Sequence, residues 1–186
     1  YACLCSFTSP LRSILLGIGY LLFSCAICAI TAELHRFYRY PLRTGWLLLG
    51  PLCTGVLYIF FLDQPDLRTR CINALLAVQN LWTMQLILRR GMQQIGRGDA
   101  LYLLGVIIMT SGLMLRVVYP NSALSALPSE SSATAVLIPF VGFFIALHCK
   151  AVGFVMMAHT RTQLQLQHIA NEDILTGLPN RRSVMQ

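Results

Sequence analysis

Residues 13–32 read SILLGIGYLLFSCAICAITA, an uninterrupted run without a charged side chain. About 20 mostly apolar residues are enough for one helix to cross the hydrocarbon core of a bilayer. Four further apolar stretches follow, at residues 44–62, 71–88, 100–118 and 133–158. All five are predicted to be helices, because lipid offers no hydrogen-bond partner to an open backbone. The predicted fold is an all-α, polytopic transmembrane helix bundle.

The composition supports a membrane protein. Of 186 residues, 56% are hydrophobic and 11% are charged, whereas soluble domains carry about 25% charged residues. The mean hydropathy is +0.64. The net charge of +7 does not indicate nucleic acid as a partner, because the arginines flank the apolar runs. The seven cysteines show neither a disulfide framework nor a metal-binding pattern, so no metal site is expected.

The loop charges predict the orientation. One set of connections carries most of the arginines: Arg36, Arg39, Arg43, Arg89, Arg90, Arg97 and Arg161. On the other side, acidic residues dilute the basic ones: Arg12, Arg68 and Arg70 against Asp63, Asp66 and Glu130. Basic loops stay in the cytoplasm. The chain is therefore expected to begin outside, cross five times and end inside.

A start outside the cell needs an explanation, and the first residue is Tyr1 rather than Met. We expect a fragment with one more upstream helix, making six spans, with YACLCSF as the outer end of that helix. An upstream signal peptide is the alternative. The outer loops are too short for a folded domain. The signal is therefore expected to be a small molecule, a membrane lipid or another membrane protein.

The last apolar stretch is not followed by a helix breaker. No Pro or Gly occurs between residue 158 and Gly177, which predicts one helix over residues 133–175, with 159–175 as a cytoplasmic signalling helix. Val155, Thr162, Leu166 and Ile169 are spaced as in a heptad seam. Two such helices are expected to pair in a homodimer, and a lone juxtamembrane helix is the alternative.

The chain then reads DILTGLPNRR at residues 173–182. Gly177 suits a helix end, Pro179 prevents continuation, and Asn180 suits the cap of a new helix. This stretch resembles the entry motif of the GGDEF domain of diguanylate cyclases, D-x-L-T-G-L-x-N-R-R. All eight defined positions match: Asp173, Leu175, Thr176, Gly177, Leu178, Asn180, Arg181 and Arg182.

The resemblance implies a function that composition does not. Enzymes of this family join two GTP molecules into cyclic di-GMP, with GTP and Mg²⁺ bound in two facing subunits. The implied protein lies in a bacterial inner membrane, with its C-terminus in the cytoplasm. Residues 1–158 would form the sensor or anchor, and residues 176–186 would begin a truncated GGDEF domain. The residues that match contain none of the family's catalytic or metal-binding groups, which are expected beyond residue 186.

Several ionisable residues within the apolar stretches are candidates for sensing. Lys150 is the strongest, because buried charge in a membrane is costly and often functional. Glu33 is its predicted partner in a packing salt bridge, or the amine snorkels toward the inner boundary. Arg116 is expected to snorkel or to contact a ligand. His148 and His159 are expected to be neutral packing residues, and a haem site is the alternative.

Polar and small residues predict where helices meet. Asn73 and Asn80 share one helical face, and Gln79 adds a further amide. Such groups are expected to hydrogen-bond across to neighbouring helices or to line a ligand cavity. Pro51 and Pro139 should open their helices, and Gly50 and Gly55 allow close approach, so a cavity is expected near them. Cys25 and Cys28 form one C-x-x-C pair, expected to be structural, with a redox or metal role as the alternative.

Two rival functions remain open. One is a receptor whose GGDEF domain is degenerate and only binds nucleotide or a partner. The other is a small transporter, which would need a polar pathway across the bilayer.

Overall fold

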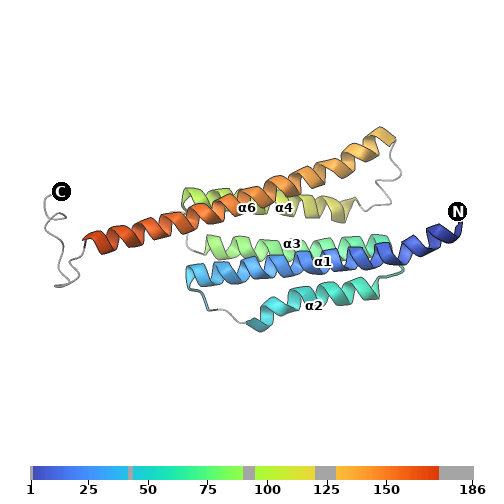
Figure 1. The fold of residues 1–186 in the computed structure, drawn as a ribbon, viewed down its shortest axis with the longest axis horizontal. Helices are drawn as coiled ribbons and strands as arrows, with labels where there is room; N and C mark the ends of the chain where they lie inside the picture. The colour runs from blue at the N-terminus through green and yellow to red at the C-terminus, as the bar shows by residue number, and fades with distance from the viewer. Residues whose placement is uncertain (1, 42–43, 90–94, 120–128, 172–186) are drawn as a thin grey trace.

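The computed structural model describes residues 2–41, 44–89, 95–119 and 129–171, and these form helices and their connections, with no strand among them (Figure 1). The helices are α1 (Ala2–Tyr38), α2 (Thr44–Phe60), α3 (Pro65–Leu88), α4 (Arg97–Val118) and α6 (Ser129–Asn171). The all-α prediction is therefore confirmed. The DILTGLPNRR motif, Asp173 to Arg182, and the predicted turn within it lie outside the described residues.

Among the described residues, four helical segments are long and apolar enough to cross a membrane: Ser13–Tyr38, Pro65–Leu88, Arg97–Val118 and Leu137–Gln167. The predicted second span is shorter than expected, because α2 has 17 residues and residues 61–63 form a turn. At 1.5 Å per residue α2 is about 25 Å long, less than the ~30 Å hydrocarbon core. It still runs antiparallel to α1 and α3, so the chain reverses direction at every connection (Figure 1).

The first helix is longer than predicted. Residues 2–12 continue α1 without a break, so the prediction that YACLCSF belongs to a separate preceding helix is wrong. At its other end α1 stops at Arg39, which adopts a left-handed φ of 57°. The Tyr40 N–H then donates to the His35 carbonyl at 2.9 Å, a closure typical of helix ends, and Pro41 follows.

The last helix reaches well past the others. α6 has 43 residues, or about 64 Å at 1.5 Å per residue, and contains Pro139 without ending there. Figure 1 shows it leaving the bundle at the end where α1 and α3 finish. The prediction of one helix from the membrane into the signalling segment is confirmed as far as Asn171, and residues 172–175 lie outside the described part.

The helices pack in a definite order. α6 lies against α4, α4 against α3, and α3 against α1 and α2, which also contact each other. Buried apolar side chains form two clusters along the bundle axis, one around Leu76 and Met109 and one around Leu86 and Tyr102. The outer surface carries many exposed large apolar side chains, as expected where lipid is the solvent.

Glycines bring α4 and α6 into close contact. A Cβ on Gly153 would lie 2.6 Å from the backbone nitrogen of Tyr102. A Cβ on Gly105 would lie 2.7 Å from the carbonyl oxygen of Ala146. Small residues at a helix contact allow such backbone approach, and the resulting van der Waals packing contributes to association between helices in lipid. The α4–α6 pair is therefore a tightly packed unit.

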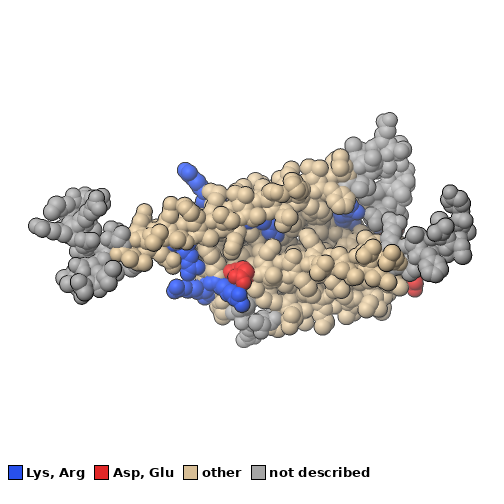
Figure 2. Space-filling view, viewed as in Figure 1, with Lys and Arg blue, Asp and Glu red and all other residues tan. Residues whose placement is uncertain are grey.

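The two ends of the bundle differ in charge by degree. Lys and Arg side chains gather near the end where α6 leaves (Figure 2). The arginines there are Arg36, Arg39, Arg89, Arg97 and Arg161. The opposite end has Asp63 and Asp66 beside the start of α3, but it also has Arg68, Arg70 and Arg116. In the folded bundle acidic residues therefore dilute the arginines at that end, as predicted from the loops.

Candidate functional site

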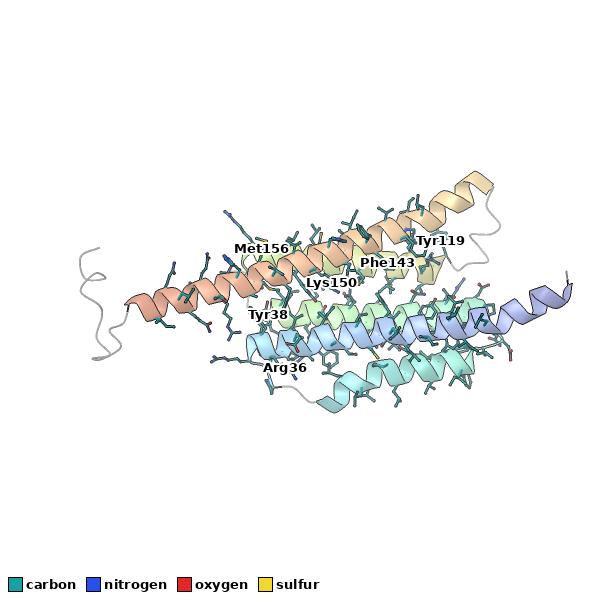
Figure 3. All side chains as sticks on the ribbon, viewed as in Figure 1. Arg36, Tyr38, Tyr119, Phe143, Lys150 and Met156 are labelled. Carbon is teal, nitrogen blue, oxygen red and sulfur yellow. The ribbon has the colours of Figure 1, made fainter. Side chains whose placement is uncertain are left out.

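Lys150 lies buried in the middle of the bundle, with only 4% of its surface exposed. Its Nζ donates to Oδ1 of Asn80 at 2.8 Å and lies 3.7 Å from Sδ of Met109. The amine also lies 5.6 Å from the centre of the Tyr102 ring, within cation–π range. Figure 3 shows Lys150 on the side of α6 that faces the other helices. The expectation that this amine snorkels toward the boundary is therefore wrong.

Asn80 holds the other side of this contact. Its Nδ2 donates to the Val106 carbonyl at 3.0 Å and to Thr110 Oγ1 at 2.7 Å. The side chain of one residue on α3 is therefore hydrogen-bonded to both α4 and α6. This confirms that Asn80 bonds across to its neighbours. Asn73 does not, because its Nδ2 donates to Thr69 on its own helix.

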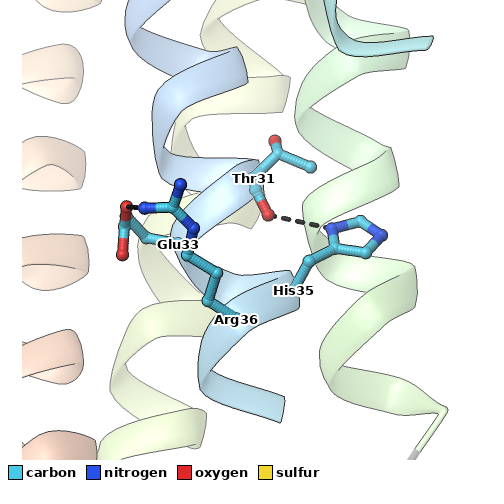
Figure 4. A network of polar contacts seen from close by, with 4 residues as sticks. All are labelled: Thr31, Glu33, His35 and Arg36. Atoms are coloured by element: carbon cyan, nitrogen blue, oxygen red, sulfur yellow. Dashed lines mark hydrogen bonds and ion pairs between the residues drawn. The ribbon is translucent and has the colours of Figure 1, made fainter. Parts of the chain in front are cut away.

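Glu33 is not the partner of Lys150. Its carboxylate pairs with Arg36 at 2.8 Å, one helical turn away, and both side chains are largely exposed (Figure 4). The predicted salt bridge fails because Glu33 lies on the outer face of α1, whereas Lys150 lies inside the bundle. An exposed pair of this kind contributes about 0–1 kcal/mol.

The remaining ionisable candidates do not converge on Lys150. The Arg116 guanidinium lies 6.0 Å from the Phe140 ring. His148 is exposed, donates from Nδ1 to the Phe144 carbonyl at 2.8 Å and stacks on the Phe144 ring. His159 is also exposed. Within the described ranges, no three His, Cys, Asp or Glu side chains lie close enough to hold a metal ion.

A cavity of about 460 Å³ lies between α1, α2 and α3. Its wall is mostly apolar and includes Ile27, Leu75, Val78 and Trp82. Gly50 lies in the same wall, which confirms the cavity expected beside Gly50, whereas Pro51, Gly55 and Pro139 do not line it. The polar lining includes Cys28, Thr31, His35, Gln79 and Arg89. Cys25 and Cys28 are free thiols. The volume lies within the 300–1,000 Å³ that is usual for small-molecule sites.

Gln79 links the cavity to the buried network. Its Oε1 accepts from Ser24 Oγ of α1 at 3.1 Å, and its amide lies against Gly50 of α2. Nε2 of Gln79 is buried and has no hydrogen-bond partner among the described residues. The next residue along α3 is Asn80, so α3 has the cavity on one face and the Lys150 contact on another.

A second cluster of contacts holds α6 where it leaves the bundle. We call Phe37, Tyr38, Asp99, Met157 and Arg161 the exit cluster. Tyr38 Oη donates to Asp99 Oδ1 at 2.6 Å and lies 3.2 Å from Met157 Sδ. Arg161 donates to the Phe37 carbonyl and lies 5.0 Å from the Phe37 ring. The cluster joins the end of α1 to the start of α4 and to α6.

Sequence reasoning missed this cluster. Asp99 Oδ2 accepts the Gly96 N–H at 2.8 Å, three residues back, and this carboxylate at the start of a helix is a recognisable capping pattern. That pattern could have identified Asp99. Nothing in the sequence indicates its bond to Tyr38, because 61 residues separate the two in the chain.

Comparison with known proteins adds no further assignment, because no protein-family model, curated protein or solved structure matches this chain.

Proposed function

We propose that this chain is the membrane sensor and anchor region of a diguanylate cyclase, which makes cyclic di-GMP from two GTP molecules. The observation that carries the proposal is the reach of α6. This helix runs as one rod from the bundle to Asn171, and the DILTGLPNRR stretch begins two residues later, at Asp173. A change in the bundle that shifts or rotates α6 would therefore be delivered to the entry of the output domain.

The contacts of α6 support such a coupling. Lys150 ties α6 to Asn80 of α3 in the middle of the bundle, and Arg161 ties it to α1 at the exit. Allosteric coupling needs an element whose arrangement both sites bias. In this proposal α6 is that element, and α3 transmits the state of the cavity to it.

The exposed seam of α6 supports a homodimer. Val155, Leu166 and Ile169 are 65%, 61% and 58% exposed, and Thr162 between them is exposed as well. These residues lie at heptad spacing on one face. Two α6 helices packed along this seam would bring two GGDEF domains together, each with its GTP and Mg²⁺. In this proposal the basic end of the bundle lies on the cytoplasmic side of a bacterial inner membrane.

The direct experiment measures cyclic di-GMP formed by the full-length protein from GTP and Mg²⁺. We expect product, and we expect Lys150→Met to change its rate without changing the amount of protein in the membrane. Nucleotide binding without product would instead support the degenerate receptor. If the protein neither binds nucleotide nor forms product, the resemblance on which this proposal rests is overturned.

The dimer has its own test, in a background without the native cysteines. Leu166→Cys and Ile169→Cys are expected to form symmetric disulfide-linked dimers on oxidation. Leu164→Cys is the matched control, because Leu164 is equally exposed (62%) but lies off the seam. Equal cross-linking at all three positions would show that collisions in the membrane, rather than pairing, produce the dimers.

A further inference from the structure

The cavity between α1, α2 and α3 has two unlike ends. Ile27 and Leu75 line one end, and His35 and Arg89 line the other. From Leu75 to Arg89 the cavity wall follows α3 for about 21 Å, at 1.5 Å per residue. The cavity is therefore long and narrow, and it runs from the apolar middle of the bundle to its basic end.

The side of the cavity is open toward the region where lipid would lie. Leu49 of α2 and Val78 and Trp82 of α3 line the cavity, yet these side chains are 48%, 61% and 44% exposed. A molecule dissolved in the bilayer could enter between α2 and α3 without crossing water. The short helix α2 forms one wall of this opening.

The end of the cavity that His35 and Arg89 line carries basic side chains. The lining residues include Arg89 and His35 but no Asp or Glu. Arg89 is exposed and caps the last turn of α3, where its own N–H bonds to the Gln85 carbonyl at 3.0 Å. A guanidinium at the polar mouth of an apolar tunnel complements a carboxylate or phosphate on an apolar chain.

We propose that this cavity binds a single-chain anionic lipid, with its anionic group at Arg89. The ligand enters from the bilayer between α2 and α3. The inference names the signal for the sensor region, but it does not depend on the cyclase output, because binding is measured without it.

Trp82 provides a direct readout from inside the cavity. The chain has two tryptophans, so Trp46→Phe leaves Trp82 as the sole reporter. In detergent-solubilised protein, brominated palmitate is expected to quench Trp82 saturably. Unlabelled palmitate should reverse the quenching, and cetyl alcohol, which lacks the charge, should compete at least about tenfold more weakly.

Arginine variants test the headgroup assignment. Arg89→Gln is expected to weaken palmitate binding at least about tenfold and to remove the preference for acid over alcohol. Arg97→Gln is the matched control, since Arg97 is exposed at the same end of the bundle but does not line the cavity. Its effect should stay below about twofold, because exposed charges at a distance are screened.

Two results would overturn the site as a whole. One is quenching that never saturates, which would show that the lipid only collides with an exposed tryptophan. The other is saturable quenching by brominated phosphatidylglycerol that palmitate cannot reverse, which would assign the cavity to an ordinary two-chain phospholipid. Loss of cyclase activity with palmitate binding intact would count against the proposed function and leave this site standing.

Discussion

The contact between Lys150 and Asn80 makes a quantitative prediction about coupling inside the bundle. The perturbations are Asn80→Leu, Lys150→Met and the double variant, each close to its parent in size. Asn80→Leu removes the oxygen that accepts the 2.8 Å hydrogen bond from Nζ and leaves the buried amine with only the Met109 thioether and the Tyr102 ring. Lys150→Met removes the amine itself and keeps the apolar stem that packs on Gly105.

The two single variants should lower the free energy of unfolding by different amounts, because each leaves a different group without a hydrogen-bond partner. An uncompensated buried charged group costs about 3–5 kcal/mol when its partner is removed, and relaxation toward Met109 and the Tyr102 ring lowers this, so we expect about 3 kcal/mol for Asn80→Leu. Lys150→Met leaves only an amide oxygen unpaired, at about 1 kcal/mol. The double variant should cost about 2 kcal/mol, less than Asn80→Leu alone, because it leaves no orphaned amine.

Equilibrium unfolding in mixed micelles of increasing denaturing detergent would measure these three free energies. The expected coupling is about 2 kcal/mol, well above the ~0.3–0.5 kcal/mol within which independent sites add. It also exceeds the ~0.6 kcal/mol that is average for neutral hydrogen bonds between membrane helices. Additive costs, or a double variant less stable than Asn80→Leu, would show that the amine does not depend on Asn80 and would refute the reasoning.

Three further predictions concern other contacts. Gly153→Leu should destabilise the bundle by about 1–3 kcal/mol in the same unfolding assay, because its side chain would meet the backbone of α4, whereas Gly19→Ala, with open space around it, should change stability by less than about 0.5 kcal/mol. Tyr38→Phe should leave the Asp99 carboxylate without its 2.6 Å donor, which costs about 1–3 kcal/mol, and it should speed proteolysis where α6 leaves the bundle; unchanged cleavage would show that the exit cluster does not hold α6. Arg39→Gly should raise stability by about 1 kcal/mol, because glycine adopts the left-handed φ of 57° without strain, and a loss of stability would mean that the arginine side chain contributes more than its backbone costs.

The position of α3 explains why these contacts belong together. Gln79 and Asn80 are neighbours in the chain, but one reaches α1 and the other reaches α4 and α6. A displacement of α3 by an occupied cavity would therefore be felt at Lys150. Cavity occupancy and the Lys150 contact can be varied independently, by ligand and by mutation, so their coupling is measurable.

The sequence by itself determined the class of fold and the place of each helix along the chain, whereas several helix ends differ from the prediction by three residues or more. Apolar runs of span length can only be helices in lipid, and the absence of Pro and Gly between residues 158 and 177 predicted the long α6 helix. The basic loops of the chain also predicted which end of the bundle carries most of the arginines. These features are local or periodic along the chain, so no knowledge of the neighbouring helices was needed. The short α2 departed from the prediction because the turn at residues 61–63 replaced its last residues.

Tertiary structure alone decided which polar groups meet. Lys150 was recognised as a candidate from its place in an apolar run, but its partner was expected to be Glu33, a carboxylate near the inner end of the first apolar stretch. In the folded bundle Glu33 lies on the outer face of α1 with Arg36, and Asn80, a neutral residue 70 positions away, accepts the bond. The hydrogen bond between Tyr38 and Asp99 could not be predicted from the sequence either. Contacts between helices depend on how each helix is rotated about its axis and on which helix lies beside it. Those two quantities are decided by side-chain packing across the whole bundle, and no local pattern contains them.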